Sequence, residues 1–178
     1  MAKRFMTFLR ILIVLGGVYL FIIYLPGLLI NGYSSIDILN VDELISRFKG
    51  WGLLSVFGLF GLILYIWTVF LQVIKGFGTP IPLVPPKKLL VGAPYSYCRN
   101  PMVLGAIMFY FGLCAFIGSW EAFSIVAVMA VILLAYVKFW EEAELEARFG
   151  QAYTEYKNNT PFLVPRIFGR RWYFLFLR

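Results

Sequence analysis

The sequence predicts an all-α integral membrane protein with four transmembrane helices and a cytoplasmic C-terminal amphipathic helix. Two observations lead to this fold class. Hydrophobic residues make up 61% of the 178 residues and charged residues only 14%, which is more apolar surface than a globule of this size can bury without lipid. The apolar residues also form long runs with Lys and Arg at their ends, as membrane-spanning segments do. We expect one membrane domain over residues 1–178.

The first two expected spans are residues 11–30 and 51–74. A basic segment precedes the first run, but the run is too long for a signal peptide and no small-residue cleavage site follows it. Pro26-Gly27 is expected to kink or end this helix. Between the two spans, Asn40 and Glu43 resemble a capping box, and the apolar residues that follow at helical spacing predict a short amphipathic helix on the outer surface.

The last two expected spans, residues 102–117 and 120–140, form a tight helical hairpin. Only Gly118-Ser119 separates them, and so short a connection makes the two helices antiparallel. Gly105 and Gly112 lie on one face of the third span, where they allow close helix packing within the hairpin.

Two polar clusters flank this hairpin. The stretch 94–104, PYSYCRNPMVL, precedes it, and the pair Glu141-Glu142 follows it. Because the two helices are antiparallel, both clusters are expected at the same membrane face. We therefore predict a cofactor site where they meet.

The distribution of basic residues predicts the topology. With both termini inside, only Arg47 and Lys49 of the 16 Lys and Arg residues fall outside, which agrees with the positive-inside rule. We expect N- and C-termini in the cytoplasm and, as the location, the cytoplasmic membrane of a bacterium or archaeon. The net charge of +7 follows from these flanks, so the lipid bilayer is the expected partner and nucleic acid is not.

The composition also excludes several kinds of chemistry. The chain has no histidine, which excludes a histidine-ligated metal and Ser-His catalysis. Its two cysteines, Cys98 and Cys114, make neither a disulfide framework nor a metal site. We expect no metal.

Beyond Trp140 the pattern is that of an amphipathic helix with its apolar side formed by Leu145, Phe149, Ala152 and Tyr156. Glu141 and Glu142 lean toward this packed side, whereas Glu144 and Glu146 lie to either side of it. An inward carboxylate at a membrane interface needs a partner, which favours a functional or buried pair. The alternative is a solvated acidic first turn that favours the helix dipole.

Arg99 has two possible roles. It is either a basic membrane anchor that pairs with Glu141 or Glu142, or a planar fork that binds a carboxylate of a ligand. Periodicity does not decide between them.

A series of short motifs stands in order along the second half of the chain. They are Thr79-Pro80-x-Pro82, Pro85-Pro86-Lys87, Pro94-Tyr95, Arg99-Asn100-Pro101-Met102, Glu141-Glu142-x-x-Leu145-x-x-x-Phe149-Gly150-x-x-Tyr153-x-x-Tyr156 and Val164-Pro165-Arg166. With a helical hairpin in the middle, this set resembles the isoprenylcysteine carboxyl methyltransferase and phospholipid methyltransferase superfamily of integral membrane enzymes. The resemblance covers about residues 79–166, roughly half of the chain, and implies that these residues form the cofactor-binding part. Ala93 stands where the family usually has Gly, and Val103 where it often has Tyr.

The resemblance implies S-adenosylmethionine (SAM) as the cofactor, bound at the cytoplasmic face, and a lipid-like acceptor that enters from the bilayer. By position in the motifs, the cofactor-binding residues would be Leu89, Leu90, Tyr95, Arg99, Asn100, Glu141 and Glu142. Leu89 and Leu90 would pack beside the adenine. Arg99 and Glu142 are the expected catalytic residues.

The function predicted from the sequence is SAM-dependent methyl transfer to a lipid-like or small apolar acceptor, such as a prenylcysteine-like carboxylate or a phospholipid amine. Methyl transfer from a sulfonium depends on in-line placement in dry surroundings more than on a strong base. Two alternatives stay open at this stage. One is an NADPH-dependent enzyme related to the membrane sterol reductases, and the other is a non-catalytic, degenerate member of the family.

Overall fold

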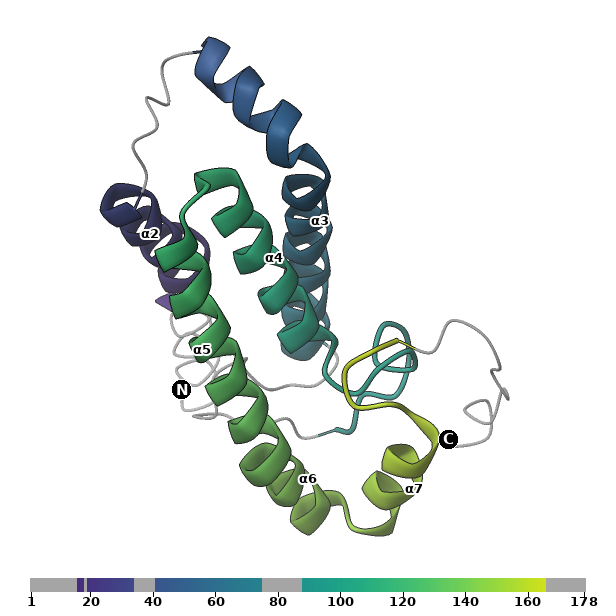
Figure 1. The fold of residues 1–178 in the computed structure, drawn as a ribbon. Helices are drawn as coiled ribbons and strands as arrows, with labels where there is room; N and C mark the ends of the chain where they lie inside the picture. The colour runs from purple at the N-terminus through teal and green to yellow at the C-terminus, as the bar shows by residue number, and fades with distance from the viewer. Residues whose placement is uncertain (1–15, 18, 34–40, 75–87, 166–178) are drawn as a thin grey trace, which may run out of the picture.

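The computed structural model describes residues 16–17, 19–33, 41–74 and 88–165, and every regular element among them is a helix. Figure 1 shows their arrangement. The elements are the π-helical turn η1 (Leu20–Tyr24), α2 (Leu25–Tyr33), α3 (Val41–Ile74), α4 (Pro101–Ile117), α5 (Trp120–Tyr136), the π-helical turn η2 (Val137–Glu141), α6 (Glu142–Phe149) and α7 (Gln151–Asn159). The all-helical prediction is confirmed for this part of the chain.

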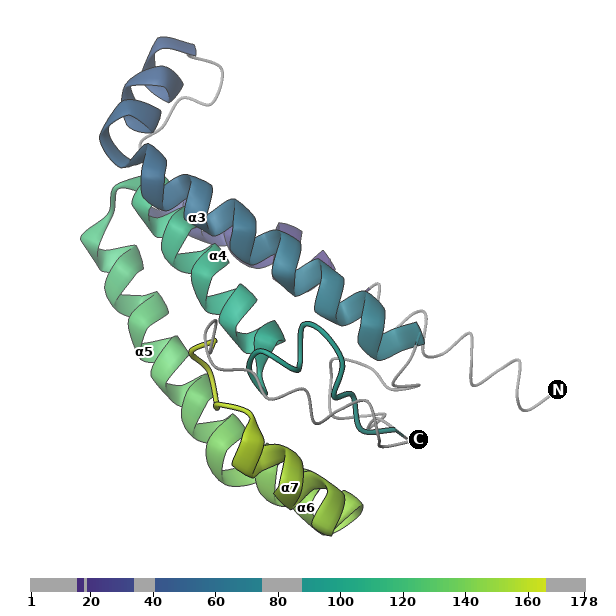
Figure 2. The same ribbon diagram turned by 90° about the vertical axis from the view of Figure 1, so that its right-hand side faces the viewer.

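The closest helix contact in the fold joins α3 and α4, which lie side by side in both views (Figures 1 and 2). Glycines on the two helices face each other. A Cβ atom at Gly112 would lie 2.4 Å from the Cα of Gly58, and one at Gly61 would lie 2.5 Å from the backbone nitrogen of Phe109. No larger residue fits between backbones at this distance, so these glycines fix the approach of the two helices.

The tight turn between α4 and α5 is confirmed. Gly118 has a φ of 73°, in the left-handed region, and its N–H donates to the carbonyl of Cys114. Ser119 caps α5 by accepting from the N–H of Ala122. One expectation about this hairpin is wrong. Gly105 and Gly112 pack against α3 and not within the hairpin, because the glycines that match them are on α3.

The first apolar segment packs on α3 and α4. The ring of Phe21 stacks on Tyr65 with 4.1 Å between centroids, and the hydroxyl of Tyr110 donates to the carbonyl of Phe21 over 2.8 Å. Pro26 does not end this helix, which continues to Tyr33. The helix instead widens to a π-helical turn directly before α2, a common adjustment near a residue that cannot donate a backbone hydrogen bond.

Two helical segments are long and apolar enough to cross a membrane, namely Leu54–Ile74 and Trp120–Phe149. The other two apolar helices, Leu20–Gly32 and Pro101–Ile117, are shorter within the described residues. The chain therefore has the features of a membrane protein, and the arrangement of four spans stays a prediction.

Two exposed tryptophans lie on the continuous helix that begins with α5. Trp120 is 74% exposed and Trp140 is 70% exposed, and one helix separates them by about 30 Å, the thickness of a bilayer hydrocarbon core. Tryptophan prefers the interface between lipid and water. The residues after Trp140 would then project beyond the lipid.

Two expected boundaries differ from the structure. The outer amphipathic helix and the second span form one helix, α3, and the first turns of α3 lean away from the rest (Figure 2). The capping residue Asn40 lies outside the described residues. The C-terminal amphipathic helix is not separate from the fourth span, because α5 continues through η2 into α6 and the chain turns only at Gly150.

The turn at Gly150 also changes which residues face inward. Gly150 has a φ of 56°, which favours glycine, and α7 folds back beside α6 (Figure 1). Leu145, Phe149 and Tyr156 pack inward as expected. Ala152 is exposed, so its assignment to the packed side is wrong, because a single continuous helix does not extend from residue 141 to 156.

The glycine contact predicts a large difference between two similar substitutions. Gly112→Ala places a methyl group against the backbone of α3 and should destabilise the protein by about 1–3 kcal/mol or more. Gly27→Ala, a helical position with nothing within 4 Å, should be neutral or slightly stabilising. Thermal unfolding in detergent measures both. Equal melting temperatures for the two variants would contradict the α3–α4 contact.

Candidate functional site

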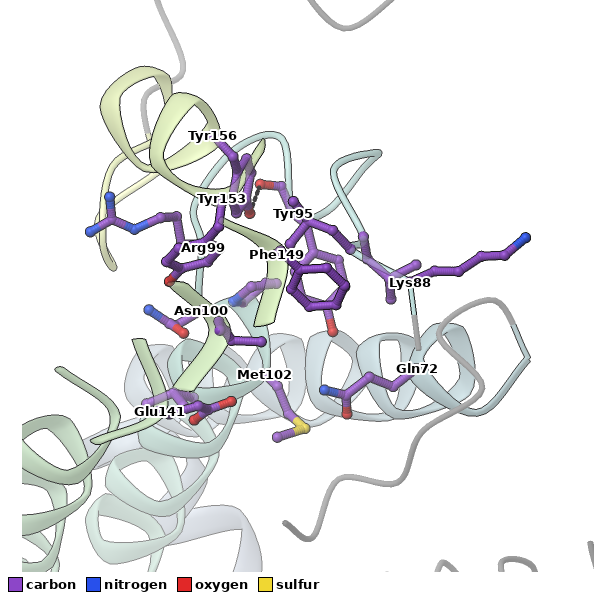
Figure 3. A pocket seen from close by; sticks show the side chains of 15 residues that line it. Gln72, Lys88, Tyr95, Arg99, Asn100, Met102, Glu141, Phe149, Tyr153 and Tyr156 are labelled. Atoms are coloured by element: carbon purple, nitrogen blue, oxygen red, sulfur yellow. Dashed lines mark hydrogen bonds between the residues drawn. The ribbon is translucent and has the colours of Figure 1, made fainter. Parts of the chain in front are cut away.

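A pocket lies where the loop 88–100 and the C-terminal helices α6 and α7 cover the ends of α3 and α4 (Figure 3). Its empty space, open mouth included, is about 620 Å³. The lining is mostly apolar and aromatic with a few polar groups. It consists of Gln72, Lys88, Leu89, Leu90, Tyr95, Arg99, Asn100, Pro101, Met102, Val103, Glu141, Leu145, Phe149, Tyr153 and Tyr156.

The segment just before α4 is held by the segment that follows α7. The backbone N–H of Arg99 donates to the carbonyl of Pro161 over 2.8 Å, and the side-chain amide of Asn100 donates to the carbonyl of Phe162 over 3.1 Å. The ring of Phe162 lies 5.8 Å from the guanidinium of Arg99 and 5.0 Å from the ammonium of Lys138, within reach of cation–π attraction. Residues 160–163 therefore tie the start of α4 to the α5–α6 helix.

The polar centre of the site is a buried ion pair. Nη2 of Arg99 lies 2.9 Å from Oε1 of Glu142, and their side chains are 7% and 2% exposed. Nη1 of Arg99 donates to the carbonyl of Lys157 over 2.6 Å. The other carboxylate oxygen of Glu142 lies 3.2 Å from Nζ of Lys138 and 3.8 Å from Nζ of Lys157.

These contacts determine which of the two roles of Arg99 the geometry favours. Both terminal nitrogens of its guanidinium are occupied by protein oxygens, and only Nε lacks a partner among the described residues. Arg99 is thus paired with Glu142, and its two terminal nitrogens are not free to bind a ligand carboxylate together. Glu142 itself does not line the pocket and lies behind Arg99.

Glu141 differs from its neighbour. It is half-buried, lines the pocket, and has no ion-pair partner among the residues that the structure describes. Glu144 and Glu146 pair on the surface with Arg148 and Lys157. Of the two inward-leaning carboxylates, Glu142 holds the structure together and Glu141 faces the empty space.

Three tyrosines form the wall opposite Glu141. Tyr95, Tyr153 and Tyr156 are buried together, with Leu89 and Leu90 packed against them. The hydroxyl of Tyr156 donates to the backbone carbonyl of Tyr95 over 2.7 Å (Figure 3). Burial, and then the negative charge of Glu141, raise the pKa of Tyr95 well above its ordinary value, so its hydroxyl stays a neutral donor.

Neighbouring Cys98 is not poised for nucleophilic chemistry. Burial raises the pKa of its thiol to about 11, so the thiolate is scarce at neutral pH. The groups that can act on a ligand are instead the Glu141 carboxylate, the Tyr95 hydroxyl and the apolar walls.

The structure brings together most of the site residues predicted from the sequence. Leu89, Leu90, Tyr95, Arg99, Asn100 and Glu141 line one pocket. Sequence reasoning missed Gln72, which reaches this pocket from α3. Its signal was present, since Gln72 is an isolated amide near the end of an apolar run.

A model of the phospholipid methyltransferase family matches residues 53–152, more than half of the chain. The chain belongs to the phospholipid methyltransferase family. Methanethiol S-methyltransferase 2 of Bradyrhizobium diazoefficiens is 38% identical over 77 residues, which are 43% of this chain and 29% of that relative. The chain thus matches under a third of the length of this curated relative. No solved structure matches significantly.

Membership of the phospholipid methyltransferase family confirms the resemblance seen in the motifs and does not favour a sterol-reductase-like activity. The matched residues include α4, α5, the Glu141-Glu142 pair and Gln72. The Arg99–Glu142 ion pair does not fill the pocket, because an open space remains beside Arg99.

The buried ion pair predicts a strong effect of removing one partner. Glu142→Gln leaves the buried guanidinium of Arg99 without its carboxylate and should lower the free energy of unfolding by about 3–5 kcal/mol. Arg99→Ala should cost less than Glu142→Gln, because Lys138 and Lys157 still lie beside the carboxylate of Glu142. Glu144→Gln, which breaks an exposed pair on the next turn, should cost less than about 1 kcal/mol. Melting temperatures of the three variants in detergent test this, and equal values for Glu142→Gln and Glu144→Gln would contradict it.

Proposed function

We propose that this protein is an integral membrane methyltransferase that transfers a methyl group from SAM to a small apolar or lipid-like acceptor. The observation that carries the proposal is that the family motifs, far apart in sequence, line one open pocket. The acceptor reaches that pocket from the lipid around α3, α4 and α5.

The lining fits the chemical groups of SAM. Leu89 and Leu90 offer an apolar surface to the adenine, and the unpaired Glu141 carboxylate suits the ammonium group or the ribose hydroxyls. The rings of Tyr95, Tyr153 and Phe149 suit a sulfonium, since aromatic faces attract cations. When bound, SAM supplies an electrophilic methyl group, and the protein holds it dry and in line with the acceptor.

Arg99 and Glu142 act in this proposal as positioning residues. Their ion pair fixes the start of α4 against α6, so that Asn100 and Glu141 keep a constant spacing across the pocket. This replaces the direct catalytic part that the sequence analysis gave to both residues. Nε of Arg99 remains available for one hydrogen bond to the cofactor.

The apolar lining suits two acceptor classes. The family name points to a phospholipid amine, and the name of the Bradyrhizobium relative points to a small thiol. Both kinds of acceptor dissolve in lipid and can reach the pocket from the bilayer. A methyl-transfer assay with one acceptor of each class distinguishes between them.

Cofactor binding tests the proposal directly. Calorimetry should detect binding of S-adenosylhomocysteine (SAH) to the purified protein, and Glu141→Gln should weaken it about tenfold by removing a charged ligand. Glu144→Gln, whose side chain does not line the pocket, should bind SAH like the wild type. Absence of SAH and SAM binding at millimolar concentration would rule the proposal out.

Methyl transfer identifies the acceptor class. With isotope-labelled SAM, the protein should label either ethanethiol or phosphatidylethanolamine in vesicles, and mass spectrometry of a lipid extract extends the search to other lipids. A protein that binds SAM and labels none of these would contradict the proposed acceptor classes and leave the cofactor assignment standing.

We further propose that the pocket and both termini face the cytoplasm. Glu121 and Glu144 are exposed at opposite ends of the α5–α6 helix, and the two native cysteines are buried. In intact cells, a membrane-impermeant thiol reagent should modify a Glu121→Cys variant and leave a Glu144→Cys variant unmodified until the cells are opened. The reverse labelling pattern would overturn this orientation.

A further inference from the structure

Three buried polar atoms of pocket-lining residues have no partner in the described part of the chain. One is Nε of Arg99, on a side chain that the ion pair with Glu142 holds in place. The other two are Oε1 of Gln72, near the end of α3, and the hydroxyl of Tyr95, a side chain that is only 9% exposed. Both residues line the same pocket, and Figure 3 shows the ends of both side chains on its α3 side. Neither atom contributes to the stability of the fold through a hydrogen bond.

Unpaired buried polar atoms are costly and rare, so a pair of them in one pocket needs an explanation. The contrast with Thr68, one turn earlier on α3, is instructive. Thr68 is also buried, but its hydroxyl donates to the carbonyls of Leu64 and Tyr65 within its own helix. A hydroxyl on this helix can donate to a carbonyl of the preceding turn, whereas Oε1 of Gln72 is an acceptor and the backbone N–H groups within the helix are already bonded. A donor for Oε1 must therefore come from outside α3.

We propose that Gln72 and Tyr95 form a hydrogen-bonding pair that recognises a ligand in the pocket, with Gln72 as a specificity-determining residue. The ligand group donates an N–H or O–H to Oε1 of Gln72 and offers a lone pair to the hydroxyl of Tyr95. This inference rests on the proposed function, since it concerns the ligands of the same pocket.

A group with a donor beside a lone pair is the chemistry that fits this pair. It has two sources in the proposed reaction. The purine edge of the cofactor carries an amine beside a ring nitrogen, and the head group of an acceptor carries a thiol, amine or hydroxyl. Gln72 belongs to α3, an apolar helix, and Tyr95 to the loop that covers the end of α3. The pair therefore lies where a cofactor from the aqueous side and an acceptor from the lipid side would come together.

The test uses Gln72→Leu and Tyr95→Phe, which remove the unpaired atoms and keep most of the packing. The backbone carbonyl of Tyr95 still accepts from Tyr156 in the second variant. Thr68→Val is the matched control on α3, because it removes a hydroxyl that does not reach the pocket. Three quantities are measured: the melting temperature without ligand, the Kd of SAH by calorimetry, and the KM of whichever of ethanethiol and phosphatidylethanolamine accepts the methyl group.

We expect both pocket variants to melt at or above the wild-type temperature, since neither loses a hydrogen bond of the folded protein. Each should weaken one ligand about tenfold, while Thr68→Val changes neither ligand constant. A higher Kd for SAH assigns the pair to the cofactor, and a higher acceptor KM with unchanged Kd assigns it to the acceptor.

Other results overturn the inference. A fall in melting temperature without a change in Kd or KM would show that the two residues are structural. Unchanged values in all three measurements would show that water, and not a ligand, binds both atoms. If neither ethanethiol nor phosphatidylethanolamine accepts a methyl group, the Kd of SAH alone decides the test. If the wild type binds no SAH, the proposed function fails and this inference fails with it. Wild-type binding with equal binding by the variants refutes the inference alone.

Discussion

The ion pair between Arg99 and Glu142 is the constraint on which the candidate site depends. The α4 and α5 helices are joined by a tight turn at one end and separate toward the other, where the pocket lies (Figure 1). At that open end the guanidinium of Arg99 meets the carboxylate of Glu142, and the carbonyls of Lys157 and Pro161 bind the same residue. Together with the bond from Asn100 to the carbonyl of Phe162 and the packed tyrosine cluster, this connection holds α6 and α7 over the start of α4.

The glycine contact between α3 and α4 supplies the opposite wall. Two backbones packed this closely behave as one rigid unit, because no flexible side chain separates them. Gln72 on α3 and Met102 on α4 therefore keep a fixed relation to each other. The site thus combines a rigid wall within the helix pair with a second wall that the buried charge pair, the tyrosine cluster and the hydrogen bonds to Pro161 and Phe162 hold in place.

Part of this organisation could be predicted from the sequence. The hairpin followed from the two residues between its apolar runs, and the inward lean of Glu141 and Glu142 followed from helical periodicity. The helix that packs against Gly105 and Gly112 could not be predicted, because small residues indicate a close helix contact but do not indicate which helix makes it. Ala152 was misplaced because periodicity does not reveal that Gly150 adopts a positive φ. Gln72 was missed because its role depends on what surrounds it in space.

The unbroken course of α5 through η2 into α6 has a mechanical consequence. One helix that is long and apolar enough to cross a membrane also carries both carboxylates of the site. From the turn at Gly118, Glu142 lies about 35 Å along this helix, so a change in tilt of about 10° displaces it by about 6 Å. A displacement of that size exceeds the reach of the Arg99 ion pair. The angle of α5 relative to α4 and the distance between Glu142 and Arg99 are therefore coupled, because the carboxylate moves with the helix.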